Sequence, residues 1–175
     1  MANAKLAIEK TLRNEGFGLE NDPVDRGGQT YCGISRVHWP AWPGWGLIDA
    51  GEAVPSSLLY SFYGAYWNSI NGDAIMSQPI AERLYDMAVN MGAVTVSKML
   101  QRCINLFLKT YQLDVDGKIG PNTASSLNSL PAKDQTLVLL ALKCLHGAHY
   151  ITLTEKDPSQ KRFIRGWLNR VGGVG

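Results

Sequence analysis

"EGFGLENDPVDRGGQTYCGIS", which spans residues 15–35, holds two glutamates, two aspartates, five glycines, one proline and one threonine. A segment of the folding core would repeat its apolar residues every two or about every 3.6 positions, and this stretch does neither. Its glycines and the pair Asp22-Pro23 favour turns, and glycine loses more backbone freedom on folding than other residues. Because ordered loops of this kind often carry function, we expect the functional residues to lie here.

The composition of the whole chain is that of one globular domain. Its 175 residues are 45% hydrophobic, which is enough to bury a core. The formal net charge of +2 suits an anionic polymer partner and does not indicate nucleic acid. The sequence has no apolar run of about 18 residues and no signal-peptide pattern at its N-terminus. We therefore expect a monomer that is made in the cytoplasm and has no stable membrane insertion.

No metal or cofactor is expected. The chain has three cysteines: Cys32, Cys103 and Cys144. They cannot all pair within one chain and match no metal motif, so we expect reduced thiols. His146 and His149 lack the further ligands of a zinc site, and we expect them to be structural or exposed. In the loop 113–123, Gly117 stands fourth from Asp114 rather than sixth and no glutamate closes the segment, which excludes an EF-hand.

Glu15 follows a predicted amphipathic helix over residues 2–14. Gly16 is a natural terminator of that helix, so Glu15 is expected at or just beyond its C-terminal end. The negative end of a helix dipole disfavours a charged carboxylate, and cover by Phe17 would add desolvation in the same direction. A general acid needs these conditions at neutral pH, whereas the alternative is a solvated glutamate at a helix end.

A short β-hairpin is predicted within residues 16–35. Asp25 and Thr30 follow Glu15 by ten and fifteen positions, and they are its candidate polar partners. Asp22 precedes a proline, so it is better explained as an Asx-type turn residue.

Residues 36–55 are rich in tryptophan and proline. The indoles of this segment are Trp39, Trp42 and Trp45. The segment either packs as a rigid aromatic loop on the core or presents one or two indoles as a stacking wall for ligand rings. Trp42 is the candidate for the second role, and a helix is expected next, over residues 56–68.

Apolar residues at helical spacing dominate the rest of the chain. They predict helices over residues 78–91, 96–111, 134–153 and 158–170, with Gly92 between the first two.

Two groups of polar residues on these helices each have two interpretations. Asp86 and Asn90, four positions apart, share one helix face and form either an interhelical hydrogen-bond pair or the floor of a groove. The segment 156–170 carries five basic residues, Arg170 among them, against Asp157 alone. A solvated helix face explains this excess, and contact with an acidic polymer is the alternative.

The stretch 15–35 resembles the signature of glycoside hydrolase family 108, the N-acetylmuramidases found as phage endolysins and secretion-associated muramidases. The family pattern is Glu-Gly-Gly, then Asp-Pro-x-Asp-x-Gly-Gly-x-Thr-x-x-Gly-Ile. The matching residues are Glu15, Gly16, Asp22, Pro23, Asp25, Gly27, Gly28, Thr30, Gly33 and Ile34. Similar segments follow at residues 66–67, 86–92, 100–102, 115–123 and 166–171. Phe17 stands where the family has its second glycine.

The resemblance implies a mainly α (α+β), lysozyme-like fold, with helices around a groove and a small β-hairpin on one wall. It implies a catalytic muramidase lobe over residues 1–92 and a helical peptidoglycan-binding lobe over residues 93–175, packed as one globular unit. Peptidoglycan is then the partner, and the enzyme is bacteriolytic once it reaches the cell wall. Because no signal peptide is recognised, a holin or an export machinery is expected to provide the route.

The resemblance also implies roles for individual residues. Glu15 is the general acid at the β-1,4 bond between N-acetylmuramic acid and N-acetylglucosamine. The order Glu, Asp, Thr is similar to that of phage lysozymes of another family, which assigns Asp25 and Thr30 to the positioning of water. The reaction is then inverting, with acid and base about 6.5–9.5 Å apart. The expected substrate contacts are Phe17, Asp22, Trp42 and Asn90.

Two other functions stay open at this point. A lytic transglycosylase would use Glu15 alone, and a hydroxyl of the sugar would replace water to give a 1,6-anhydro product. A non-catalytic peptidoglycan-binding accessory protein of a secretion system would keep only the groove. The presence of Glu15, Asp25 and Thr30 argues against this second alternative, whereas Phe17, in place of the family glycine, keeps it open.

Overall fold

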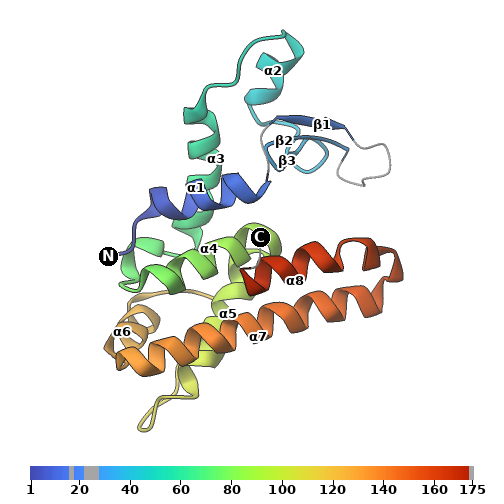
Figure 1. Cartoon of the computed structure of the whole chain (residues 1–175). Helices are drawn as coiled ribbons and strands as arrows, with labels where there is room; N and C mark the ends of the chain where they lie inside the picture. The colour runs from blue at the N-terminus through green and yellow to red at the C-terminus, as the bar shows by residue number, and fades with distance from the viewer. Residues whose placement is uncertain (16–17, 22–27, 174–175) are drawn as a thin grey trace.

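The computed structural model describes residues 1–15, 18–21 and 28–173. Most of this part is helical, and one small sheet lies at one end (Figure 1). The predicted class, mainly α (α+β) and lysozyme-like, is therefore confirmed. The elements are α1 Ala4–Glu15, β1 Leu19–Asn21, β2 Gln29–Tyr31, β3 Ile34–Ser35, α2 Gly44–Asp49, α3 Ser56–Ser69, η1 Gly72–Ala74, α4 Gln78–Met91, α5 Ala93–Asn105, α6 Pro121–Ser129, α7 Ala132–Lys156, η2 Pro158–Arg162 and α8 Ile164–Gly172.

Helix α1 begins at a side-chain cap. The Asn3 carboxamide oxygen accepts hydrogen bonds from the backbone N–H groups of Lys5, at 3.0 Å, and Leu6, at 3.4 Å. Asparagine is a preferred residue at this position because it satisfies donors that have no partner inside the helix. The buried residues of α1 follow helical spacing and face the core: Ala7, Ile8, Thr11 and Leu12.

Helix α4 is the centre of the molecule. It packs against α1, α3, α5 and α7. Gly92 ends it with a positive φ of 82°, which glycine adopts without strain, and this turn leads directly into α5. The predicted separation of two helices at Gly92 is thus confirmed. The buried residues of α4 are Ile80, Ala81, Leu84, Tyr85, Met87 and Ala88.

Helix α7 is the longest element, with 25 residues. It is long and apolar enough to cross a membrane, a property that core helices of soluble proteins can share. In Figure 1 it lies beside α8, and it also packs on α4 and α5. Its buried residues recur every four positions, as expected for one face of a helix against a core: Val138, Leu142, His146, Tyr150 and Thr154.

Four predicted segments differ from the observed elements. Helix α2 lies within the segment expected to be an aromatic loop, and α6 begins where only a loop was expected. The helix expected over residues 158–170 is divided into the 3-10 helix η2 and the helix α8. Helix α5 ends at Asn105 rather than at residue 111, because the Asn105 side chain bonds both the N–H and the C=O of Leu113 and holds a loop there.

Candidate functional site

Glu15 is the last residue of α1, as expected from the glycine that follows it. The first strand of the sheet begins four residues later, at Leu19. The structure describes the backbone of Glu15 but not its side chain.

Thr30 lies in β2, the central strand of the sheet. Its Cα pairs with Glu20 of β1 on one side and with Ser35 of β3 on the other. Cys32 and Gly33 join β2 to β3 with φ values of 47° and 80°. Two successive residues with positive φ are typical of a type I′ turn, which suits the twist of a tight hairpin. The position of Thr30 is thus set by pairing on both sides.

Buried tyrosines attach the sheet to the helices. The Tyr63 hydroxyl of α3 donates to the Cys32 carbonyl at 2.7 Å, and the Tyr85 hydroxyl of α4 donates to the Tyr63 carbonyl at 3.1 Å. Tyr63 and Tyr85 are at most 1% exposed. Burial strengthens such bonds and makes their loss costly, so the turn after Thr30 is fixed relative to α4.

Arg36 joins the sheet to α2. Its guanidinium donates to the Gln29 side chain of β2 and to Asp49 of α2, each at 2.8 Å, and lies 5.1 Å from the ring centroid of Trp45. The hydrogen bond from Arg36 is the main cause that lowers the pKa of the Asp49 carboxyl.

Three of the predicted site residues, Phe17, Asp22 and Asp25, lie outside the described residues. Their roles stay predictions, as does the separation between Glu15 and Asp25.

Trp42 is 8% exposed and packs inside an aromatic cluster. Its ring centroid lies 5.3 Å from Trp45, 6.0 Å from Tyr31 and 6.4 Å from Phe62. Trp39 has the more exposed indole, with 48% of its surface accessible, and packs edge-on against Phe62 at 5.2 Å. The first alternative, an aromatic segment on the core, therefore describes how Trp42 packs. Its contact with substrate stays a prediction.

Asn90 is exposed, and its amide donates to the backbone carbonyl of Asp86 at 2.6 Å. The Asp86 carboxylate instead accepts a bond from Arg170 Nε of α8 at 2.8 Å. Asp86 thus forms an interhelical pair, as the first alternative expected, but its partner is Arg170 rather than Asn90. The solvated face predicted for the last helix is therefore wrong for Arg170, whose side chain is only 17% exposed.

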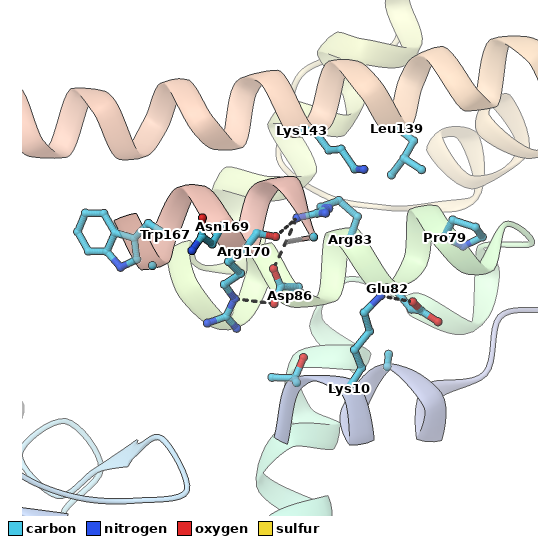
Figure 2. Close-up of a pocket in the computed structure, with 14 residues that line it drawn as sticks. Lys10, Pro79, Glu82, Arg83, Asp86, Leu139, Lys143, Trp167, Asn169 and Arg170 are labelled. Carbon is cyan, nitrogen blue, oxygen red and sulfur yellow. Dashed lines mark hydrogen bonds and ion pairs between the residues drawn. The ribbon is translucent and has the colours of Figure 1, made fainter. Parts of the chain in front are cut away.

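A pocket of about 710 Å³ lies between α1, α4, α7 and α8. Figure 2 shows Lys143 reaching into it from α7, Arg83 and Asp86 from α4, and Arg170 from α8. Two further charged residues line it, Lys10 of α1 and Glu82 of α4, whose side chains pair at 3.1 Å. Four cationic side chains thus meet two carboxylates.

Arg83 connects α4 to the end of α8. Its guanidinium donates to the backbone carbonyls of Arg170, at 3.3 Å, and Val171, at 3.1 Å, which lie in the last turn of α8. A cation there is favourable because the helix dipole is negative at its C-terminus. Burial lowers the pKa of Arg83, and the nearby Asp86 carboxylate opposes that shift.

The sequence did not predict that these residues form one pocket. Its charged residues come from positions as far apart as Lys10 and Arg170, and no local pattern reports such a contact. The available signals were the basic excess in residues 156–170 and the spacing of Arg83 and Asp86, three positions apart on one helix.

His146 of α7 is fully buried, with 0% exposure. Burial, followed by the positive charges of Arg83 and Arg170, lowers the pKa of His146 to about 3. Neither ring nitrogen has a hydrogen-bond partner within the described part of the chain. Its ring packs on Tyr150 with centroids 4.6 Å apart, so His146 is one of the structural histidines expected.

Potential metal ligands do not gather in residues 1–15, 18–21 and 28–173: these ranges hold no group of three His, Cys, Asp or Glu side chains suited to an ion. In the loop once compared with an EF-hand, Asp116 instead accepts a hydrogen bond from Gln101 at 2.7 Å. Gln101 also accepts from the backbone N–H of Gly117 and donates to the carbonyl of Lys118.

Comparison with known proteins gives two family matches. The family described as glycosyl hydrolase 108 matches residues 8–92. The family described as a predicted peptidoglycan domain matches residues 95–172. No curated protein matches the sequence.

The structure is similar to that of SagA from Brucella abortus. The TM-score is 0.72 at 25% sequence identity, and the similarity covers 98% of this chain and 90% of that one. The shared architecture therefore includes both matched segments.

Proposed function

This chain belongs to the glycosyl hydrolase 108 family through residues 8–92 and carries a predicted peptidoglycan domain over residues 95–172, and from this we propose that it is an N-acetylmuramidase. The two families make it a glycoside hydrolase that acts on peptidoglycan. The proposed reaction is hydrolysis of the β-1,4 bond between N-acetylmuramic acid and N-acetylglucosamine.

The observation that carries the proposal is the position of Glu15 inside the matched segment. Glu15 is the final residue of α1, and the first strand of the sheet begins four residues later, at Leu19. We assign the general acid to Glu15, which protonates the leaving oxygen as the glycosidic bond breaks.

The second part of the proposed site is the group that holds the attacking water. We assign it to Asp25 and Thr30, and Thr30 is supported by its fixed place in the central strand. Water then enters on the face opposite the acid and the configuration inverts. Phe17, Asp22, Trp42 and Asn90 are the proposed substrate contacts, with Trp42 acting from within its aromatic cluster.

Mass spectrometry of digested sacculi tests the reaction. Hydrolysis adds one water across the cleaved bond, so the products carry ordinary reducing ends at muramic acid. A 1,6-anhydro product, lighter by one water, would replace the proposal with a lytic transglycosylase. Intact sacculi that bind the protein would replace it with a non-catalytic binding function.

A pair of matched substitutions tests the water-positioning role. Asp25→Asn is expected to abolish hydrolysis while binding to insoluble peptidoglycan persists, because the carboxylate that orients water is lost. Asp22→Asn is expected to act mainly through folding, since that side chain is assigned to a turn as well as to a substrate contact. Turnover on sacculi, binding to sacculi and melting temperature are measured together. An inactive but fully stable Asp22→Asn protein would exchange the two roles.

The proposed organisation follows the two family matches. We propose a catalytic lobe over residues 1–92 and a binding lobe over residues 93–175, joined at Gly92, which act together on the cell wall. A holin or an export machinery remains the predicted route to that wall.

A further inference from the structure

We propose that the pocket between α1, α4, α7 and α8 binds a carboxylate of the peptide stem that muramic acid carries. This inference rests on the proposed function, since it assumes that peptidoglycan occupies the site near Glu15. It adds a substrate-binding site formed by both lobes, with Lys143 as the residue that meets the carboxylate.

The charge of the pocket favours an anion. Asp86 is already engaged, by Arg170 at 2.8 Å and by Arg83 at 3.9 Å, and Glu82 is paired with Lys10. Lys143 is half-buried in the wall, and no ion pair or hydrogen bond joins it to another residue of the described chain. An anionic ligand would stabilise this half-buried ammonium and the two guanidinium groups near it, because opposite charges attract more strongly away from bulk water.

The pocket has the size that such a ligand needs. Its volume of about 710 Å³ is within the usual range of small-molecule sites. Gly166 of α8 also lines it and is exposed. Trp167 stacks on Tyr150 with centroids 4.8 Å apart and gives the pocket one rigid apolar wall.

The pocket lies within reach of a stem. Thr11 of α1 lines it, and Glu15 is one helical turn further along the same helix, about 6 Å along the axis. The stem leaves the glycan at muramic acid, the sugar at the proposed cleavage point. Three extended peptide residues span about 10 Å, so a carboxylate of the stem reaches the pocket while the sugar stays beside Glu15.

Calorimetric binding of two muramyl tripeptides tests the proposal. One carries free carboxylates on its stem, and the other carries the same carboxylates as amides. The wild-type protein is expected to bind the free acid about tenfold more tightly, as one charge-assisted hydrogen bond provides. Lys143→Glu and the neutral Lys143→Met should both remove this preference without lowering the melting temperature.

A further variant controls for charge. Lys133→Glu makes the same charge change on α7 about 15 Å from Lys143, and it should keep the preference for the free acid. Equal affinity for acid and amide, or equal loss in Lys133→Glu and Lys143→Glu, would overturn the proposal.

The binding test of the pocket and the digestion test of the proposed function can succeed or fail independently. Binding needs no cleavage, so Glu15→Gln should keep the preference for the free acid. If the protein prefers the free acid but leaves sacculi uncut, the proposed hydrolase function is refuted and the proposed carboxylate site is supported. If sacculi are cut and no preference exists, the pocket inference alone fails.

Discussion

Arg170 and Asp86 form an ion pair between α8 and α4, with side chains 17% and 14% exposed. Removing one partner of such a pair leaves the other charge with little access to water. Arg170→Ala is therefore expected to lower the free energy of unfolding by about 2–3 kcal/mol, less than for a fully buried pair. Urea denaturation measures this change.

Arg165, an exposed arginine of the same helix, provides the control. Arg165→Ala should change the free energy of unfolding by no more than about 0.5 kcal/mol. Equal losses for the two variants would show that the ion pair adds nothing to stability.

Glu15 and Arg170 show what the sequence can and cannot predict for single residues. The end of α1 at Glu15 was predictable because the signal, Gly16, is the next residue in the chain. The partner of Arg170 was not, because Asp86 lies 84 positions away and only the fold brings α8 onto α4. Local composition therefore assigned Arg170 to solvent.

At the scale of elements, α7 carries a buried histidine that makes stability depend on pH. The pKa of His146 falls from an ordinary value of 6.5 to about 3 in the folded protein. The unfolded chain thus binds a proton that the folded protein does not bind. The free energy of unfolding therefore decreases as the pH falls from about 6.5 toward 3. Within that window the loss approaches ~1.4 kcal/mol per pH unit.

His146→Phe keeps an aromatic ring and removes the titrating group. The variant is expected to gain stability over wild type progressively below pH 6.5, measured by urea denaturation at several pH values. His38→Gln, which changes an exposed histidine outside α7, is the control. A His146→Phe curve parallel to that of wild type would contradict the role of His146.

Helices were predictable where apolar residues recur strongly. The expected 78–91 helix is α4, and the expected 134–153 helix is contained in α7. Helix α6, with the sequence PNTASSLNS, was missed because serine and asparagine hide the spacing of Ala124 and Leu127. Helix α2 was missed because tryptophan and proline are typical of an irregular aromatic segment.

At the scale of the whole molecule, stability is expected to be independent of disulfides. The three cysteines are free: Cys32 and Cys103 are buried and Cys144 is exposed. Burial raises the pKa of the Cys103 thiol to about 11, which suppresses its reactive thiolate. Iodoacetamide should therefore modify Cys144 in the native protein and all three thiols only after unfolding.

Reductant should leave the melting temperature unchanged, because no crosslink is there to break. A lower melting temperature in reductant would show that two cysteines pair, and rapid native labelling of Cys103 would show that its region opens.

The division into a catalytic and a binding part was suggested by motifs, but the way the parts combine was not. Helix α4 of the first segment packs on α5 and α7 of the second, so one continuous core serves both. Arg83 and Arg170 extend that contact to charged groups. These long-range contacts depend on the complete fold and leave no pattern in the sequence of either segment.

The most direct test of the proposed muramidase is the rate at which Glu15→Gln releases reducing ends from purified sacculi. The substitution keeps size and hydrogen bonding but removes the transferable proton, so the rate should fall at least about 100-fold. Melting temperature and binding to sacculi should persist, and Glu9→Gln on the same helix should cut at the wild-type rate. Release by Glu15→Gln at a rate near that of wild type would contradict the assignment of Glu15 as the acid.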